Sequence, residues 1–142
     1  MMFLLDTNVI SELRKAGDGK ADVNVTRWLS GEDAARFYIS AVTLFELELG
    51  ILRMERRDAE QGGRLRMWMR SRVMPEFAER TLPLDMNVAQ RCAKLHVPDP
   101  RPERDAYIAA TALVHGMTMV TRNVADFAPC GVSVINPWEV SA

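Results

Sequence analysis

Residues Phe3-Leu4-Leu5-Asp6-Thr7-Asn8-Val9-Ile10-Ser11-Glu12-Leu13, near the N-terminus, combine two structural periods. The first three form a short apolar run, which is typical of a buried strand. From Thr7 onward the apolar residues follow helical spacing, and Asp6 stands where a helix N-cap belongs. A buried strand that runs directly into a helix begins a βαβ unit. Asp6 is therefore expected at the carboxyl end of a strand, where open α/β sheets bind ligands.

The same alternation continues along the chain and predicts an α/β fold, with a parallel sheet covered by helices on both faces. Pro83 indicates that its strand lies at an edge, because proline cannot donate to a central ladder. Gly62-Gly63 is expected to separate two helices, and Pro75 to end the second. The helix from residue 42 carries a wide apolar face. Strands are expected at 3–5, 37–39, 81–84, 117–120 and 132–135, and the longer helices at 7–15, 23–29, 42–57, 64–74, 86–95 and 103–115.

Length and composition point to one globular domain over residues 1–142. Hydrophobic residues make up 48% and charged residues 26%, and 18 basic against 19 acidic residues give a net charge of −1, which excludes a uniformly basic nucleic-acid surface. Cys92 and Cys130 are expected to be reduced thiols, which suggests the cytoplasm. We expect no signal peptide and no membrane span, since the longest uncharged run, 106–121, is too short to cross a bilayer.

Four acidic residues are expected near the carboxyl ends of the strands. Asp6 follows the first strand, and Glu46 lies one turn into the helix after the second. Asp105 begins the helix that leads to the fourth strand, and Asp126 follows that strand. Like charges gathered in one crevice are unfavourable without a cation. A set of oxygen ligands without His or Cys suits Mg²⁺ or Mn²⁺ rather than Zn²⁺.

Each of these acidic residues also has a structural interpretation. Asp6 can act as an N-cap, Asp105 can complement a helix dipole, and Asp126 can cap a turn. Periodicity does not choose between Glu46 and Glu48, because both stand between apolar neighbours. The prediction of a metal site therefore depends on all four acidic residues together and on no single one.

Four motifs stand in order along nearly the whole chain: Leu4-Leu5-Asp6-Thr7-Asn8-Val9-Ile10-Ser11-Glu12-Leu13, Ser40-Ala41-Val42-Thr43-Leu44-Phe45-Glu46-Leu47 with Gly50 after it, Asp105-Ala106-Tyr107-Ile108-Ala109-Ala110-Thr111-Ala112, and Val120-Thr121-Arg122-Asn123-Val124-Ala125-Asp126-Phe127. Together they resemble the motifs of PIN-domain ribonucleases, the VapC-type toxins and their FitB-like relatives. The second motif selects Glu46 over Glu48. Arg104 departs from the pattern, in which a small or apolar residue is common, and could pair with a site carboxylate or a phosphate.

The resemblance implies a PIN-like fold and a divalent-metal-dependent endoribonuclease that hydrolyses RNA phosphodiester bonds. Residues matching Asp6 and Asp105 are the family's principal metal ligands, and those matching Glu46 and Asp126 complete the acidic site. Four polar residues are expected to orient carboxylates or water, namely Thr7, Asn8, Thr121 and Asn123.

The resemblance also implies a toxin of a type II toxin–antitoxin pair, with an RNA substrate, a DNA-binding antitoxin and often a homodimer. One alternative is a PIN-like fold that only binds, as an antitoxin partner or corepressor component, although four gathered carboxylates have no purpose in a pure binding module. A receiver-like phospho-accepting domain is a second alternative, but no Lys follows a strand here.

An arginine-rich segment follows the second motif. Arg accounts for 15 of the 18 cations, and seven of them lie between residues 53 and 72. Met67, Trp68 and Met69 cannot all face one core, because consecutive helical positions point in different directions, so at least one should be exposed or covered by a partner. RNA, the antitoxin and a second subunit remain alternatives for this segment, whose candidate contacts are Arg53, Arg66, Arg70 and Trp68.

Overall fold

A computed structural model of the chain describes residues 1–139. Its centre is a sheet of five parallel strands in the order β3-β2-β1-β4-β5. The strands are β1 (Phe3–Leu5), β2 (Phe37–Ser40), β3 (Thr81–Leu82), β4 (Thr118–Val120) and β5 (Val134–Ile135). The predicted α/β class is confirmed, and the strand that contains Leu82 lies at the edge, as Pro83 indicated.

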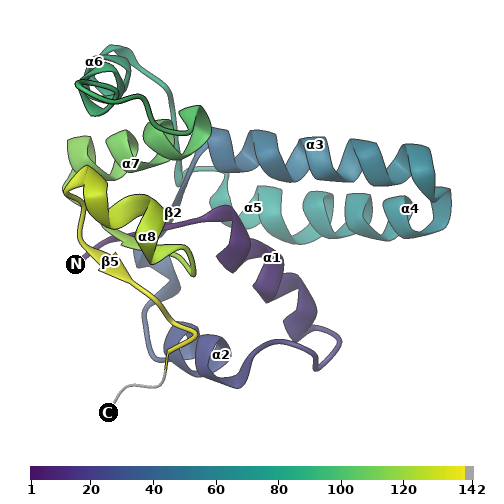
Figure 1. Cartoon of the computed structure of the whole chain (residues 1–142). Helices are drawn as coiled ribbons and strands as arrows, with labels where there is room; N and C mark the ends of the chain where they lie inside the picture. Colours follow the sequence, from purple (N-terminus) through teal and green to yellow (C-terminus); the bar gives the residue numbers. More distant parts are fainter. Residues whose placement is uncertain (140–142) are drawn as a thin grey trace.

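Helices cover both faces of the sheet (Figure 1). They are α1 (Thr7–Ala16), α2 (Val23–Ser30), α3 (Ala41–Arg57), α4 (Ala59–Trp68), α5 (Met74–Phe77), α6 (Met86–Leu95), α7 (Glu103–His115) and α8 (Val124–Phe127), with a π-helical segment at Met69–Val73 and short 3₁₀ turns at Ala34–Arg36 and Ala128–Cys130. Among residues 1–139, none of these helices has the length and apolar character needed to span a membrane.

The central strand β1 divides the core in two. Phe3 and Leu5 pack into a cluster that includes Val9 of α1, whereas Leu4 packs into a second cluster with Ile108 of α7. Successive side chains of a strand point to opposite faces, so each face requires its own helical cover. The alternation within three residues explains why helices lie on both sides of the sheet.

The register of β1 and β4 brings their carboxyl ends together. Leu5 pairs with Val120, and the next residue, Asp6, donates its backbone N–H to the Val120 carbonyl at 2.9 Å. Thr121 leaves β4 at the same level and donates its backbone N–H to Ile135 of β5. Asp6 and Thr121 therefore begin their loops side by side.

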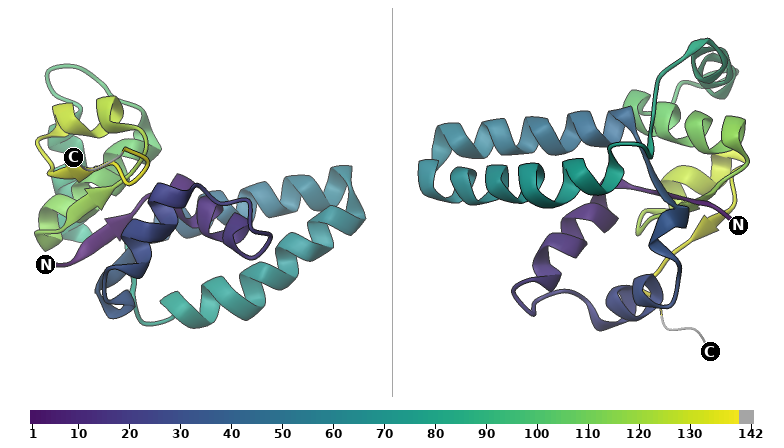
Figure 2. Two further views of the ribbon diagram at one scale, coloured as in Figure 1. Left: turned by 90° about the horizontal axis from the view of Figure 1, so that it is seen from below. Right: turned by 180° about the vertical axis from the view of Figure 1, so that it is seen from behind.

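The α3–α4 hairpin, residues 41–68, differs from the sequence prediction. Gly62-Gly63 does not separate the helices; α3 ends at Arg57, and Asp58 caps α4 by accepting a hydrogen bond from the Gln61 backbone N–H. Pro75 likewise does not end a helix but lies in the first turn of α5, directly after the π-helical segment. The two long helices lie side by side and extend away from the sheet (Figure 1, Figure 2).

Close packing explains the glycine within this hairpin. A Cβ on Gly62 would stand 2.4 Å from the Cα of Glu55 in α3, whereas one on Gly63 would meet nothing within 4 Å. Glycine at position 62 thus permits the two helix backbones to approach, rather than breaking a helix. Sequence alone does not distinguish these two uses of glycine.

The apolar face of α3 is only partly buried. Leu47 and Ile51 lie in the core, but Phe45 is 51% exposed and Leu52 is 52% exposed. The wide apolar face predicted for this helix therefore contains a stripe that stays half exposed within residues 1–139.

Candidate functional site

The Asp6 carboxylate is held by three donors at the end of β1. Its Oδ1 accepts the Thr7 backbone N–H at 2.8 Å, and its Oδ2 accepts the Thr121 hydroxyl at 2.7 Å and the Asn8 amide at 3.2 Å. The Ile10 backbone N–H also reaches its carbonyl. Asp6 is the N-cap of α1, as the structural interpretation held, yet it is only 5% exposed and one carboxylate oxygen faces across to β4.

The polar residues of the first and fourth motifs form a network around this carboxylate. Asn8 donates its side-chain amide to Thr121 at 3.3 Å and accepts the Arg122 backbone N–H at 3.4 Å. Asn123 enters through its backbone, which donates to the Thr121 hydroxyl at 3.0 Å. The network holds Asp6 in one orientation before any ligand binds.

Glu46 lies beside this network and is joined to it by a threonine. The Thr7 hydroxyl donates to Glu46 Oε1 at 2.7 Å and lies 3.3 Å from the hydroxyl of Thr43, a fully buried residue of α3. Sequence reasoning missed Thr43, although a threonine three residues before Glu46, one helical turn away, was a signal. Glu48 points elsewhere, because it pairs with Arg66 of α4.

Asp105 and Asp126 approach from the other side. Asp105 stands in the first turn of α7 and is partly buried, and Asp126 lies in α8 and is exposed. Burial raises the pKa of the Asp105 carboxyl above its usual value, and the charges of Asp126 and Glu46 raise it further. The end of β1, the helix α3 after β2, the first turn of α7 and the helix α8 after β4 thus place four carboxylates around one edge of the sheet.

Burial dominates the electrostatics of Asp6. It raises the pKa of this carboxyl to about 6, against the opposing effect of the hydrogen bonds from Thr121 and Thr7; the charges of Asp105 and Glu46 add to the rise. An ionised Asp6 is therefore unfavourable unless positive charge is supplied.

The arrangement matches a known family. A family model for the PIN domain matches residues 3–128. The chain belongs to the PIN domain family.

Similar proteins cover the PIN domain over nearly its full length. VapC ribonuclease Y4jK from Sinorhizobium fredii is 36% identical over 146 residues, which span 97% of this chain and 99% of that protein. Toxin FitB from Neisseria gonorrhoeae is 36% identical over 144 residues, with coverage of 97% and 99%. The structure of FitAB bound to an IR36 DNA fragment contains a chain with a TM-score of 0.88 and 34% identity, covering 99% of each chain.

The acidic residues of this PIN domain suit a divalent cation chemically, but they are not gathered into a finished ligand cage. In residues 1–139, no group of three or more His, Cys, Asp or Glu side chains is already arranged to hold a metal ion. Mg²⁺ commonly binds proteins through one or two carboxylates and retains several waters. Oxygen ligands with raised pKa values, Asp6 and Asp105, fit such an ion.

Arg104 borders the PIN site. Its guanidinium lies 3.7 Å from Glu46 Oε2 and 5.1 Å from the centroid of the Phe45 ring. The sequence offered a site carboxylate or a phosphate as its partner. In the structure Arg104 pairs with the carboxylate of Glu46. This ion pair is loose, and half of the Arg104 side chain is exposed.

The arginine side chains of the hairpin lie outside this network, although Glu46 at the start of α3 belongs to it. Arg66 is only 17% exposed and bridges Glu48 at 2.6 Å and Glu55 at 2.9 Å, so its guanidinium joins α4 to α3. Arg53 and Arg70 are exposed on the surface. Arg66 is thus occupied within the hairpin rather than free to contact a phosphate.

The three consecutive large residues of α4 and its extension point in different directions, as predicted. Met69 is buried, Trp68 is partly buried, and Met67 is 66% exposed. Trp68 also lines a groove of about 720 Å³ between α1 and α4, together with Ile10, Leu13 and Met67. The hairpin therefore presents an apolar groove away from the carboxylates.

Proposed function

We propose that this PIN domain is a divalent-metal-dependent endoribonuclease and the toxin of a toxin–antitoxin pair. The observation that carries the proposal is the buried, hydrogen-bonded Asp6 with its raised pKa beside Glu46 and Asp105. A ribonuclease and a toxin among the similar proteins support the same assignment. We place the activity in the cytoplasm, where the free thiols of Cys92 and Cys130 stay reduced.

Hydrolysis of a phosphodiester needs an oriented water and positive charge against the pentacovalent phosphate. Mg²⁺ or Mn²⁺, when bound, supplies that charge. Asp6 and Asp105 would hold the ion, and Glu46 and Asp126 would complete the acidic site. Thr121 and Asn8 fix the orientation of Asp6, and Thr7 fixes Glu46. Preset ligands lose little freedom when the ion and the substrate arrive.

Cleavage of a mixed-sequence single-stranded RNA in Mg²⁺ tests this proposal. Asp6→Asn and Asp105→Asn should each lower turnover at least about 100-fold, since even partners behind a metal ligand are worth 10–100-fold. Asp85→Asn is the matched control, because Asp85 is an exposed cap of α6 far along the chain from the motifs. A chelator should abolish cleavage, and Zn²⁺ should not restore it.

Full activity of Asp6→Asn, or full activity in chelator, would contradict the metal-dependent nuclease. Intact RNA after incubation with the wild-type protein would instead favour the alternative, a PIN fold that only binds.

We also infer that a DNA-binding antitoxin occupies the groove between α1 and α4. Trp68, Met67 and Leu13 offer apolar surface of the kind found at interface cores, and Arg64 and Arg14 stand on its border. The similar FitAB complex was solved on DNA, as expected if the partner is the DNA-binding component.

Trp68→Ala tests the antitoxin groove. Loss of a buried aromatic anchor should weaken antitoxin binding by about 2 kcal/mol or more. The same variant examined by gel filtration tests whether this surface also holds a homodimer. Unchanged antitoxin affinity and unchanged self-association would assign Trp68 to the core alone.

A further inference from the structure

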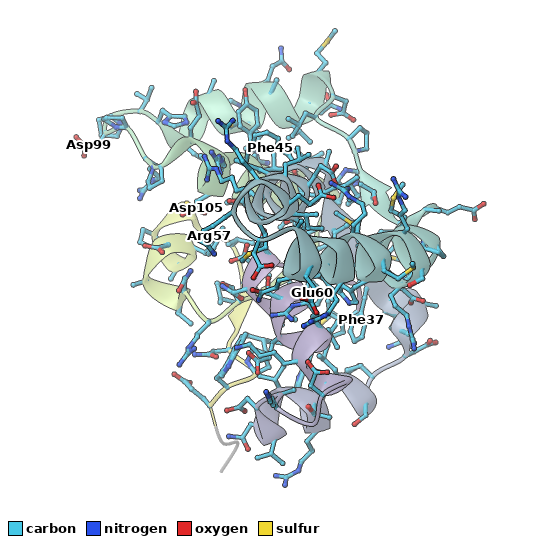
Figure 3. The ribbon with its side chains drawn as sticks, turned by 90° about the vertical axis from the view of Figure 1, so that its right-hand side faces the viewer. Phe37, Phe45, Arg57, Glu60, Asp99 and Asp105 are labelled. Carbon is cyan, nitrogen blue, oxygen red and sulfur yellow. The ribbon has the colours of Figure 1, made fainter. Side chains whose placement is uncertain are left out.

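An exposed aromatic ring and an arginine stand together at the rim of the carboxylate site. Phe45 of α3 is 51% exposed, and the guanidinium carbon of Arg104 in α7 lies 5.1 Å from its ring centroid. Each is the immediate neighbour of a site carboxylate, Glu46 and Asp105 respectively. Figure 3 labels both Phe45 and Asp105, in a view along α3.

A second pair of this kind shows what a purely structural arginine and ring look like. Arg80 lies 5.3 Å from the Phe77 ring, but Phe77 is only 5% exposed. The Arg80 guanidinium donates to the carbonyls of Ala34 and Phe37 and to Glu76. The ring of Phe77 is thus buried, and the donors of Arg80 are already bonded within the protein.

Phe45 and Arg104, by contrast, are both about half exposed. Arg104 keeps half of its side chain exposed, and its contact with Glu46 is a loose 3.7 Å. An arginine carries five N–H donors, so a distant carboxylate leaves donors that can reach a phosphate. Phe45, one residue from Glu46, is likewise about half exposed to solvent.

We propose that Phe45 and Arg104 form a nucleotide-binding subsite for single-stranded RNA, in which a base stacks on Phe45 and Arg104 contacts the adjoining phosphate. Aromatic rings and arginine planes are the surfaces on which unpaired RNA bases stack. The subsite would place the backbone beside Glu46 and Asp105. It rests on the proposed ribonuclease function and names the substrate it needs: unpaired RNA rather than duplex, since a duplex does not offer its base faces.

Binding of a short single-stranded RNA of mixed sequence, carrying a fluorescent purine analogue that stacking quenches, tests this subsite. It is measured in chelator so that the RNA stays intact. Phe45→Leu keeps apolar bulk and removes the aromatic face. It should weaken binding about tenfold and reduce the quenching, because one stacked base is worth that much. Arg104→Gln should weaken binding and flatten its salt dependence.

Leu52→Ala is the matched control. Leu52 lies two turns further along the same face of α3 and is 52% exposed, so it shares the surface of Phe45 but not its place at the site. RNA affinity of Leu52→Ala should equal that of the wild type. If Phe45→Leu and Leu52→Ala both disrupt self-association while RNA affinity and quenching stay unchanged, this face of α3 is an interface between copies and the subsite is wrong.

The outcome separates this subsite from the ribonuclease itself. If the RNA binds and its fluorescent base is quenched in a way that depends on Phe45, but the RNA is never cleaved in Mg²⁺, the proposed ribonuclease function is wrong and the subsite stands. Cleavage in Mg²⁺ with the same KM in wild type and Phe45→Leu would leave the ribonuclease and overturn the subsite.

Discussion

The carboxylate site and the outer part of the α3–α4 hairpin, residues 48–68, are both rich in charge, but they arrange it in opposite ways. In the hairpin, opposite charges meet: Arg66 bridges Glu48 and Glu55, and an exposed pair joins Arg64 to Glu60. At the strand ends, like charges meet, and the pKa values of Asp6 and Asp105 rise, chiefly through burial and further through the neighbouring carboxylates. Paired charges hold two helices together, whereas gathered like charges are unfavourable without a ligand.

Among changes that leave the four carboxylates intact, removal of the hydroxyl that orients Asp6 should have the largest effect on function. Thr121→Val deletes the 2.7 Å hydrogen bond to Asp6 Oδ2 while keeping the shape of the side chain. Cleavage of RNA should fall about 10–100-fold, as for other partners behind a metal ligand. Thr118→Val, at the opposite end of β4, is the control and should retain activity. Equal activity of the two variants would mean that the orientation of Asp6 is not needed.

The hairpin should respond to packing instead. Gly62→Ala places a Cβ against the Glu55 backbone, so the free energy of unfolding should fall by about 3 kcal/mol, at the upper end for overpacking. Gly63→Ala meets nothing within 4 Å and should raise it by up to about 1 kcal/mol. Urea unfolding of both variants measures the difference. A stable Gly62→Ala protein would show that the helices are not in close contact.

The carboxylate site should also make the stability of the metal-free protein depend on pH. The folded pKa of Asp6, about 6, lies above its usual value of 3.8, so the folded state binds more protons between these values. Stability should therefore fall as the pH rises through this range, by on the order of 2 kcal/mol from about pH 4 to about pH 7. The slope that Asp6 contributes should vanish in Asp6→Asn. An identical slope in this variant would place the titration elsewhere.

The sequence predicted the placement of the strand-end residues better than it predicted the hairpin, for a physical reason. Asp6, Thr7 and Asn8 follow directly from a strand, and parallel strands bring their ends to one edge, so topology alone places them. The role of Gly62 depends on how closely α3 approaches, which no local pattern contains. Arg66 likewise looked free because its partners, Glu48 and Glu55, lie on another helix.

The exposed part of the apolar face of α3 was likewise beyond what periodicity can predict. Phe45 and Leu52 share that face, and within residues 1–139 each keeps about half of its surface exposed. Amphipathic spacing predicts which residues share a side of a helix, not whether anything packs against it.

Thermal unfolding of the wild-type protein and Asp6→Asn, each titrated with Mg²⁺ against NaCl of equal ionic strength, tests the central claim most directly. A cation that binds the folded site stabilises it by an amount that grows with the logarithm of its concentration once that concentration exceeds its Kd. The wild-type Tm should rise with Mg²⁺, and the variant should start at an equal or higher Tm and stay there. Equal shifts in both proteins, or none in either, would contradict the view that these carboxylates are gathered for a metal ion.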